Sequence, residues 1–211
     1  MIYDVNQFCI SFRNNNISKI SDLFYGMYNK MMQCINCQII THNVQCYYYL
    51  SFSLEDVRIF KNRIYNMINI LECFEYYERQ EFMMGGNQIY CNNCNIMTNS
   101  MSQSKKLLYG PYELIIYLNR DKDLHYNIKI LFEEYLDIQR FIYYKDNSPI
   151  SYQLIGIVTL CISEQNHFIA FCKSFVDHNW YKYDNEQVNL STFEEAKSFG
   201  VPFILFYSSL K

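Results

Sequence analysis

The sequence predicts an α+β fold in which antiparallel β-sheet dominates, and three observations support this. Aromatic residues make up 18% of the 211 residues, with 21 Tyr and 16 Phe, and these side chains favour strands. Several apolar runs are short and bounded by turn residues, as strands are. Residues 165–185 have the pattern of a β-hairpin. A chain of this length is sufficient for one domain with a full hydrophobic core.

The composition argues against two classes of partner. The formal net charge is −3 and the basic residues do not cluster, so we expect no nucleic-acid partner. No apolar stretch approaches the ~20 residues of a membrane helix, and residues 1–8 lack the pattern of a signal peptide, so we expect no membrane partner. We therefore expect a cytoplasmic or nuclear protein. Its nine cysteines would then be reduced.

The N-terminal part begins without a clear pattern. Residues 1–16 are polar, with three Asn at 14–16, and we expect a leader with little structure. Residues 17–26 predict a short helix ended by Gly26. The period of residues 27–33 fits a helix and a strand equally well.

Two Cys-x-x-Cys motifs follow, at Cys34-Ile35-Asn36-Cys37 and at Cys91-Asn92-Asn93-Cys94. Two such knuckles supply four thiolates for a tetrahedral structural zinc. The long spacer does not forbid this pairing, because the entropy of loop closure grows only logarithmically with length. Asn in the turn of each knuckle tolerates a left-handed backbone. The alternatives are a redox motif or ordinary core thiols. We predict zinc bound by Cys34, Cys37, Cys91 and Cys94.

Between the knuckles, residues 47–52 alternate as a strand and Ser53 is placed to cap a helix. Apolar residues then recur at steps of three and four, which predicts one core-facing helix over residues 54–71: Val57, Phe60, Ile64, Met67 and Leu71. Four Glu fall between residues 72 and 81. They are typical of a solvated face, or alternatively of a surface that meets a basic partner.

The C-terminal half predicts mostly strands. Apolar runs at residues 113–120, 151–158 and 202–207 have the length and composition of buried strands, and looser apolar segments occupy residues 128–136 and 138–144. Residues 192–199 predict a short helix with acidic residues at its start, and Gly200 is positioned to end it.

The hairpin at residues 165–185 carries candidate chemistry. His167 opens an apolar run that ends at Lys173, the turn lies near residues 177–179, and a second run ends at Asp184. Both His167 and Asp184 should lie at the same end of the antiparallel pair and be neighbours. A carboxylate beside an imidazole fixes the ring tautomer and stabilises its protonated form, which suits a general base. The alternative is a structural hydrogen-bonded pair.

The amino-acid sequence of this hairpin resembles the histidine box of ubiquitin-specific proteases, which are papain-like deubiquitinases. The matching runs are Asn166-His167-Phe168-Ile169-Ala170-Phe171-Cys172 and Trp180-Tyr181-Lys182-Tyr183-Asp184. Further segments are similar to that family in the same order, and the resemblance covers nearly the whole chain: residues 22–26, both cysteine knuckles, 113–120, 151–158 and 202–207.

The resemblance implies a partial protease domain over residues 17–211. It would consist of fingers with a zinc ribbon at about 27–104 and a palm at about 105–211, with the thumb half largely missing. His167 would be the general base and Asp184 its orienting carboxylate. The implied reaction is thiol-dependent hydrolysis of the isopeptide bond at the C-terminus of ubiquitin, and the implied partner is ubiquitin or a ubiquitinated protein.

This sequence departs from the family pattern at the nucleophile. The family's Gly-Asn-Thr-Cys-Tyr run is absent, and Cys9 lacks both that lead-in and a helix that would lower its thiol pKa, so we identify no nucleophile. Asn166 stands where the family usually has Gly. Cys172 has opposite parity to His167 and is expected to face away from it, in the core.

Three functions therefore remain open from the sequence. The first is a deubiquitinase whose nucleophile lies on a segment outside this chain. The second is a catalytically inactive pseudoprotease module that binds ubiquitin or another partner. The third is a zinc-stapled β domain in which His167 and Asp184 are a structural pair.

Overall fold

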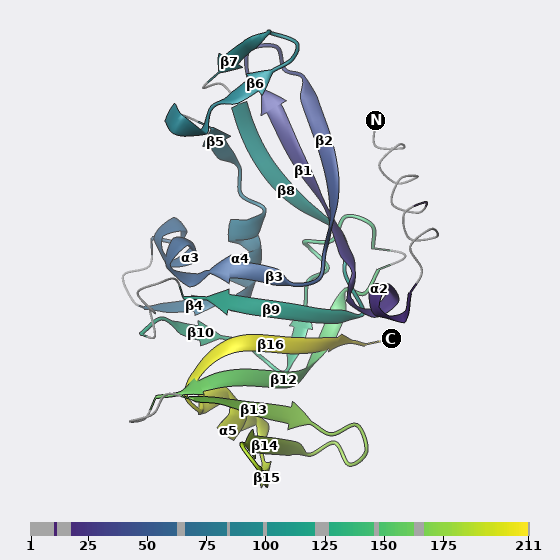
Figure 1. Cartoon of the computed structure of the whole chain (residues 1–211), viewed down its shortest axis with the longest axis vertical. Coiled ribbons are helices and arrows are strands. Elements are labelled where there is room, and N and C mark those ends of the chain that lie inside the picture. Colours follow the sequence, from purple (N-terminus) through teal and green to yellow (C-terminus); the bar gives the residue numbers. More distant parts are fainter. Residues whose placement is uncertain are drawn as a thin grey trace.

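The computed structural model describes residue 11 and residues 18–62, 66–83, 85–98, 101–120, 127–145, 148–162 and 167–210. The expected leader, residues 1–16, lies outside this part of the chain apart from residue 11. In Figure 1 a narrow four-stranded sheet projects from one side of a broader sheet, and a small ribbon forms its tip. No helix in the described ranges is long and apolar enough to cross a membrane.

The projecting sheet has the strand order β2-β1-β8-β5. Its strands and those of the two-stranded ribbon β6-β7 at the tip are β1 Gly26–Cys34, β2 Ile40–Tyr47, β5 Glu81–Met83, β6 Ile89–Cys91, β7 Ile96–Thr98 and β8 Met101–Tyr109. The 3-10 turn Gly85–Asn87 lies between β5 and β6. All pairs in these two sheets are antiparallel.

The broad sheet is eight-stranded, with the order β15-β14-β13-β12-β16-β9-β3 and with β11 paired to β12. Its strands are β3 Leu50–Ser53, β9 Glu113–Asn119, β11 Tyr135–Asp137, β12 Ser151–Cys161, β13 His167–Lys173, β14 Trp180–Asp184, β15 Gln187–Ser191 and β16 Val201–Ser209. Only the pair β3–β9 in this sheet is parallel. A separate parallel pair joins β4 Met67–Asn69 to β10 Lys129–Leu131.

One face of the broad sheet carries the main core. Side chains along β9 alternate between buried and half-buried, as expected when one face is covered. Residues from the helices α3 Leu54–Phe60, α4 Ile70–Tyr77 and α5 Phe193–Ser198 join the same core cluster. The other face is more open, and Phe168 on it is 57% exposed. The predicted α+β class with mainly antiparallel sheet is thus confirmed.

The prediction of a single helix over residues 54–71 is wrong. Ser53 does cap α3, accepting from the Asp56 N–H, but α3 ends at Phe60. A short strand follows, and Asn69 then caps α4 in a capping box with Glu72. The backbone of this strand, β4, pairs with β10. Backbone hydrogen bonds to a distant strand therefore decide the structure here, although the apolar residues recur with the period of a helix. Phe60 and Met67, predicted to be core residues, are 45% and 43% exposed.

Two other helix predictions have different outcomes. The first helix, α2 Lys19–Phe24, has Ser18 as its N-cap and Tyr25 as its C-cap, so Gly26 does not end it. Gly26 is instead the first residue of β1, where a Cβ would collide with the ring of Tyr47. The predicted C-terminal helix is confirmed as α5, with Thr192 as its N-cap. Residues 27–33, whose period was ambiguous, form part of β1.

The four Glu of residues 72–81 bind within the chain. Glu75 pairs with Lys61 and Arg140, Glu78 with Lys106, and Glu81 with Arg79. Glu72 accepts the backbone N–H of Asn69. Solvent-accessible surface pairs of this kind add little stability, about 1 kcal/mol or less each. Their carboxylates nevertheless have partners, which argues against a free acidic docking face.

Gly200 sets the turn that starts β16 beside the end of β12, and this yields a stability prediction. Its φ is +59°, and an added Cβ would lie 2.5 Å from the Leu160 carbonyl oxygen. We expect Gly200→Ala to lower the free energy of unfolding by about 2 kcal/mol or more in a urea titration. The matched control is Gly86→Ala, because a Cβ there meets nothing within 4 Å. Equal stabilities for the two variants would contradict this account.

Candidate catalytic pair and metal centre

The hairpin β13–β14 positions the candidate catalytic pair. Its register pairs Ala170 with Tyr183 and Lys173 with Trp180. Ser174, Asp177 and Asn179 order the turn, with the Tyr181 hydroxyl donating to Asp177 and lowering the pKa of that carboxyl well below its usual range. The predicted hairpin is therefore present, and its open end carries the two candidate residues.

At that end, His167 Nε2 lies 3.0 Å from Asp184 Oδ1. The side chains are 37% and 27% exposed, so solvent and a ligand can reach both. A proton on Nε2 would make this contact a hydrogen bond to the Asp184 carboxylate and would leave Nδ1 as the proton acceptor of the ring. The structure thus brings together the two residues that the sequence singled out.

Lys182 is a third member of this group, which the sequence analysis missed. Its Nζ lies 3.7 Å from Asp184 Oδ2 and 4.4 Å from the centre of the Phe199 ring. Asp184 therefore has the imidazole on one oxygen and an ammonium group near the other. The alternation of β14 was the available signal, because Lys182 and Asp184 are two residues apart and share a face.

The cysteines near this hairpin differ in position. Cys172 lies on β13 with opposite parity to His167, but it is exposed, so its predicted place in the core is wrong. Partial desolvation of its thiol raises its pKa. Cys161, which the sequence analysis did not consider, is the direct cross-strand partner of His167 on β12. Cys9 and Asn166 lie outside the described residues.

The two cysteine knuckles meet at the tip of the projecting sheet. Cys34 ends β1 and Cys91 ends β6, and both are buried, whereas Cys37 and Cys94 lie in the turns that follow. All four Sγ atoms lie within 4.8 Å of one another. The left-handed residues are Gln38 and Asn95, one position after each knuckle, and not the Asn residues inside the knuckles.

The cluster has dimensions that suit zinc. A tetrahedron with Zn–S bonds of about 2.3 Å has S–S edges of about 3.8 Å. The Cys34–Cys94 and Cys37–Cys91 Sγ pairs are 3.8 Å and 3.7 Å apart. Four thiols at these distances can hold a zinc ion, with no ligand from outside the knuckles.

The thiols also interact electrostatically. The hydrogen bond from the Ile39 N–H lowers the pKa of the Cys37 thiol to about 7. Hydrogen bonds to Cys37 and Cys91 raise the pKa of the Cys94 thiol to about 12. Metal binding requires deprotonated thiols, so a zinc ion at this cluster would release their protons.

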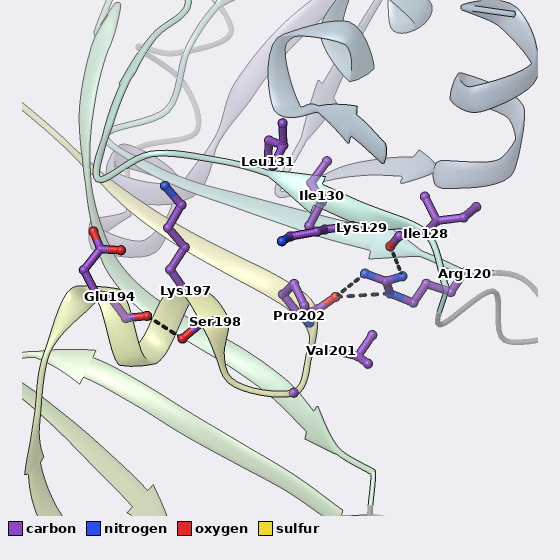
Figure 2. A pocket seen from close by; sticks show the side chains of 11 residues that line it. Arg120, Ile128, Lys129, Ile130, Leu131, Glu194, Lys197, Ser198, Val201 and Pro202 are labelled. Atoms are coloured by element: carbon purple, nitrogen blue, oxygen red, sulfur yellow. Dashed lines mark hydrogen bonds between the residues drawn. The ribbon is translucent and has the colours of Figure 1, made fainter. Parts of the chain in front are cut away.

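A cavity of about 460 Å³ lies between β10, α5 and the start of β16 (Figure 2). Arg120 on its wall is only 2% exposed and donates to the carbonyl oxygens of Ile128 and Pro202. The sequence analysis gave Arg120 no role, yet it ties the end of β9 to the starts of β10 and β16. Lys197, also on the wall, pairs with Glu133 at 2.9 Å.

The family model and two curated relatives that match this chain carry the same description, ubiquitin carboxyl-terminal hydrolase. The family model described as ubiquitin carboxyl-terminal hydrolase matches residues 6–207. Ubiquitin carboxyl-terminal hydrolase 15 of Saccharomyces cerevisiae is 22% identical over 214 residues, which cover 89% of this chain and 16% of that protein. Ubiquitin carboxyl-terminal hydrolase 13 of the same yeast is 25% identical over 209 residues, covering 90% of this chain and 26% of that protein.

Solved structures share the fold. A chain of the yeast SAGA DUB module matches with a TM-score of 0.73 and 22% identity, covering 96% of this chain and 45% of that chain. The SAGA DUB module bound to ubiquitin aldehyde matches with a TM-score of 0.69 and 22% identity, covering 99% and 48%. This chain spans about half the length of those solved chains and much less of the curated relatives. Since the family model matches most of the sequence, the chain belongs to the ubiquitin carboxyl-terminal hydrolase family.

Proposed function

We propose that this chain is the finger and palm part of a thiol-dependent deubiquitinase, with His167 as general base and Asp184 as its orienting carboxylate. The observation that carries this proposal is the 3.0 Å contact between His167 Nε2 and Asp184 Oδ1 on a solvent-accessible edge. Membership of the family supports the reaction class. The fingers would span about residues 27–104 and the palm about 105–211.

In this mechanism a cysteine thiolate attacks the isopeptide carbonyl carbon at the C-terminal glycine of ubiquitin. His167 takes the thiol proton at Nδ1 and later returns it to the departing lysine amine. Asp184 stabilises the imidazolium that exists between these two steps. Lys182, near the other oxygen of Asp184, helps to hold the carboxylate plane toward the ring. The nucleophile is not assigned to any described residue.

Ubiquitin is the proposed partner. One structure similar to this chain is described as a DUB module bound to ubiquitin aldehyde, and this supports the proposal by analogy of fold. The alternative is a catalytically inactive module that binds ubiquitin or another partner. The two proposals differ in one respect, which is whether a thiol of this protein reacts at the C-terminus of ubiquitin.

We also propose that zinc at Cys34, Cys37, Cys91 and Cys94 has a structural role. The apolar neighbours of this cluster form a small core separate from the main one, including Met32, Met83 and Ile89. A core of this size cannot stabilise the tip alone, whereas structural zinc in small sites supplies about 10 kcal/mol or more. The ion would therefore hold the β6-β7 ribbon on the end of β1.

The first test uses ubiquitin with a thiol-reactive C-terminal group and mass spectrometry to map any adduct. In a protein that carries this chain together with the nucleophile segment, we expect His167→Ala to slow adduct formation on the order of a hundredfold or more, because the nucleophile loses its base. Asp184→Asn should slow it by a smaller factor. The matched control is His178→Asn, an exposed residue at the far turn of the same hairpin with φ +60°, which Asn tolerates.

An adduct whose rate does not change in His167→Ala would contradict the proposed base. Ubiquitin binding without any adduct fits both proposals for the 211-residue chain, and the same measurement on this chain joined to its upstream coding sequence separates them. An adduct there would support the deubiquitinase, and binding without an adduct there would support the non-catalytic module. Failure to bind ubiquitin at all would contradict both proposals.

The metal proposal predicts about one zinc per chain by elemental analysis of purified protein. Cys34→Ser should abolish this zinc and lower the melting temperature, because a tetrahedral site loses a thiolate. Cys172→Ser should leave the zinc content and the melting temperature unchanged, since Cys172 lies outside the cluster. Chelation should reproduce the effect of Cys34→Ser in the unaltered protein. A stably folded protein without zinc would contradict the structural role.

A further inference from the structure

The register of β12 and β13 aligns a thiol with the proposed base. Cys161 is the direct partner of His167 in this antiparallel pair. Side chains of directly opposed residues share one face of the sheet, with Cβ atoms about 4.5–5.5 Å apart. Asp184 on β14 bonds the same imidazole. A thiol, an imidazole and a carboxylate therefore lie in a row across three neighbouring strands.

We propose that Cys161 is a reactive-thiol site that captures soft electrophiles, with His167 as the base that takes its proton. Asp184 occupies Nε2 of the ring, so Nδ1 is the nitrogen that receives the proton of the thiol. The thiolate is the nucleophilic form of cysteine, and an imidazole paired with a carboxylate promotes its formation. The ligand class is a small electrophile, since the thiol projects from a strand beside the ring.

Cys161 is also placed to be reached. It is half-buried, and the next residue, Ile162, is 59% exposed. The other described thiols outside the zinc cluster have a different environment. Cys46 lies on β2 and Cys73 on α4, and Cys172 lies on the face of β13 opposite to His167. The row with His167 and Asp184 is thus a specific feature of Cys161 among these thiols.

The reaction with iodoacetamide shows the balance of the step. The Cys161 sulfur forms a bond to the methylene carbon of the reagent, and the carbon–iodine bond breaks with loss of iodide. The thiol proton passes to His167 Nδ1 and from there to solvent. No oxidant, reductant or metal takes part.

This chemistry needs no ubiquitin and no hydrolytic activity. One consequence does rest on the proposed function: a group attached to Cys161 would stand beside His167 and block its access to the catalytic thiol. Modification of Cys161 would then inhibit a deubiquitinase without touching its nucleophile. The test below measures labelling alone, so it can fail independently of the proposed function.

The experiment follows the rate of carbamidomethylation of each cysteine in the full, zinc-loaded chain at neutral pH, with limiting iodoacetamide and peptide mass spectrometry. We expect Cys161 to react at least tenfold faster than Cys172. His167→Gln should lower the Cys161 rate about tenfold, and Asp184→Asn should lower it by a smaller factor. Cys172 serves as an internal control, because it lies on the same strand as His167 but on the opposite face.

The Cys172 rate should stay the same in all variants, which checks that the sheet remains folded. The comparison of Cys161 between the unaltered chain and His167→Gln is decisive, because it does not depend on how exposed the two thiols are. A Cys161 rate that is unchanged by His167→Gln, with the Cys172 rate also unchanged, would overturn the proposal. So would a Cys161 rate below that of Cys172 in the unaltered chain.

Discussion

The register of the central strands β12, β13 and β14 is the constraint on which the candidate site depends. Because side chains alternate across a strand, a slip of one residue would move His167 to the opposite face. Ile169 and Phe171 prevent such a slip, since they have the same parity as His167 and are 1% and 0% exposed in the main core. Burial of these two side chains thus fixes the orientation of a partly exposed ring.

The same register explains why several candidate functional residues lie together at one end of these strands. β12 ends at Cys161, β13 begins at His167 and β14 ends at Asp184, so antiparallel pairing gathers all three. Gly200 and Arg120 act at the adjoining strand ends. The left-handed turn at Gly200 lets β16 start close to the Leu160 carbonyl, and Arg120 binds the carbonyl oxygens of Ile128 and Pro202. Contacts to backbone groups therefore stabilise these strand ends in addition to side-chain packing.

The projecting sheet is stabilised by different interactions at its base and at its tip. Its base is continuous with aromatic packing, in which Tyr28 contacts Tyr47 and Tyr77, but its tip has only a small cluster around the cysteines. Pairing of β1 with β8 brings the two knuckles together across a long stretch of sequence. The metal site thus depends on the sheet for its geometry, and we propose that the tip depends on the metal for its stability.

The sequence by itself determined the elements whose signals are local. The apolar runs that form β9, β12 and β16, the cap at Ser53, the short helix near residues 192–199, and the hairpin that pairs His167 with Asp184 all follow from neighbouring residues. The paired knuckles predicted the cysteine cluster because identical motifs favour one shared site.

Only the tertiary structure decided the features that arise from pairing between distant segments. Apolar residues recur with a helical period over residues 54–71, yet residues 67–69 form a strand that pairs with β10. Backbone polar groups need hydrogen-bond partners, and β10 supplies them here. Cys161 and Arg120 carry no motif, and their neighbours come from other strands. Periodicity reports which face a side chain occupies, whereas the identity of its neighbour depends on register, and register is fixed by packing of the whole sheet.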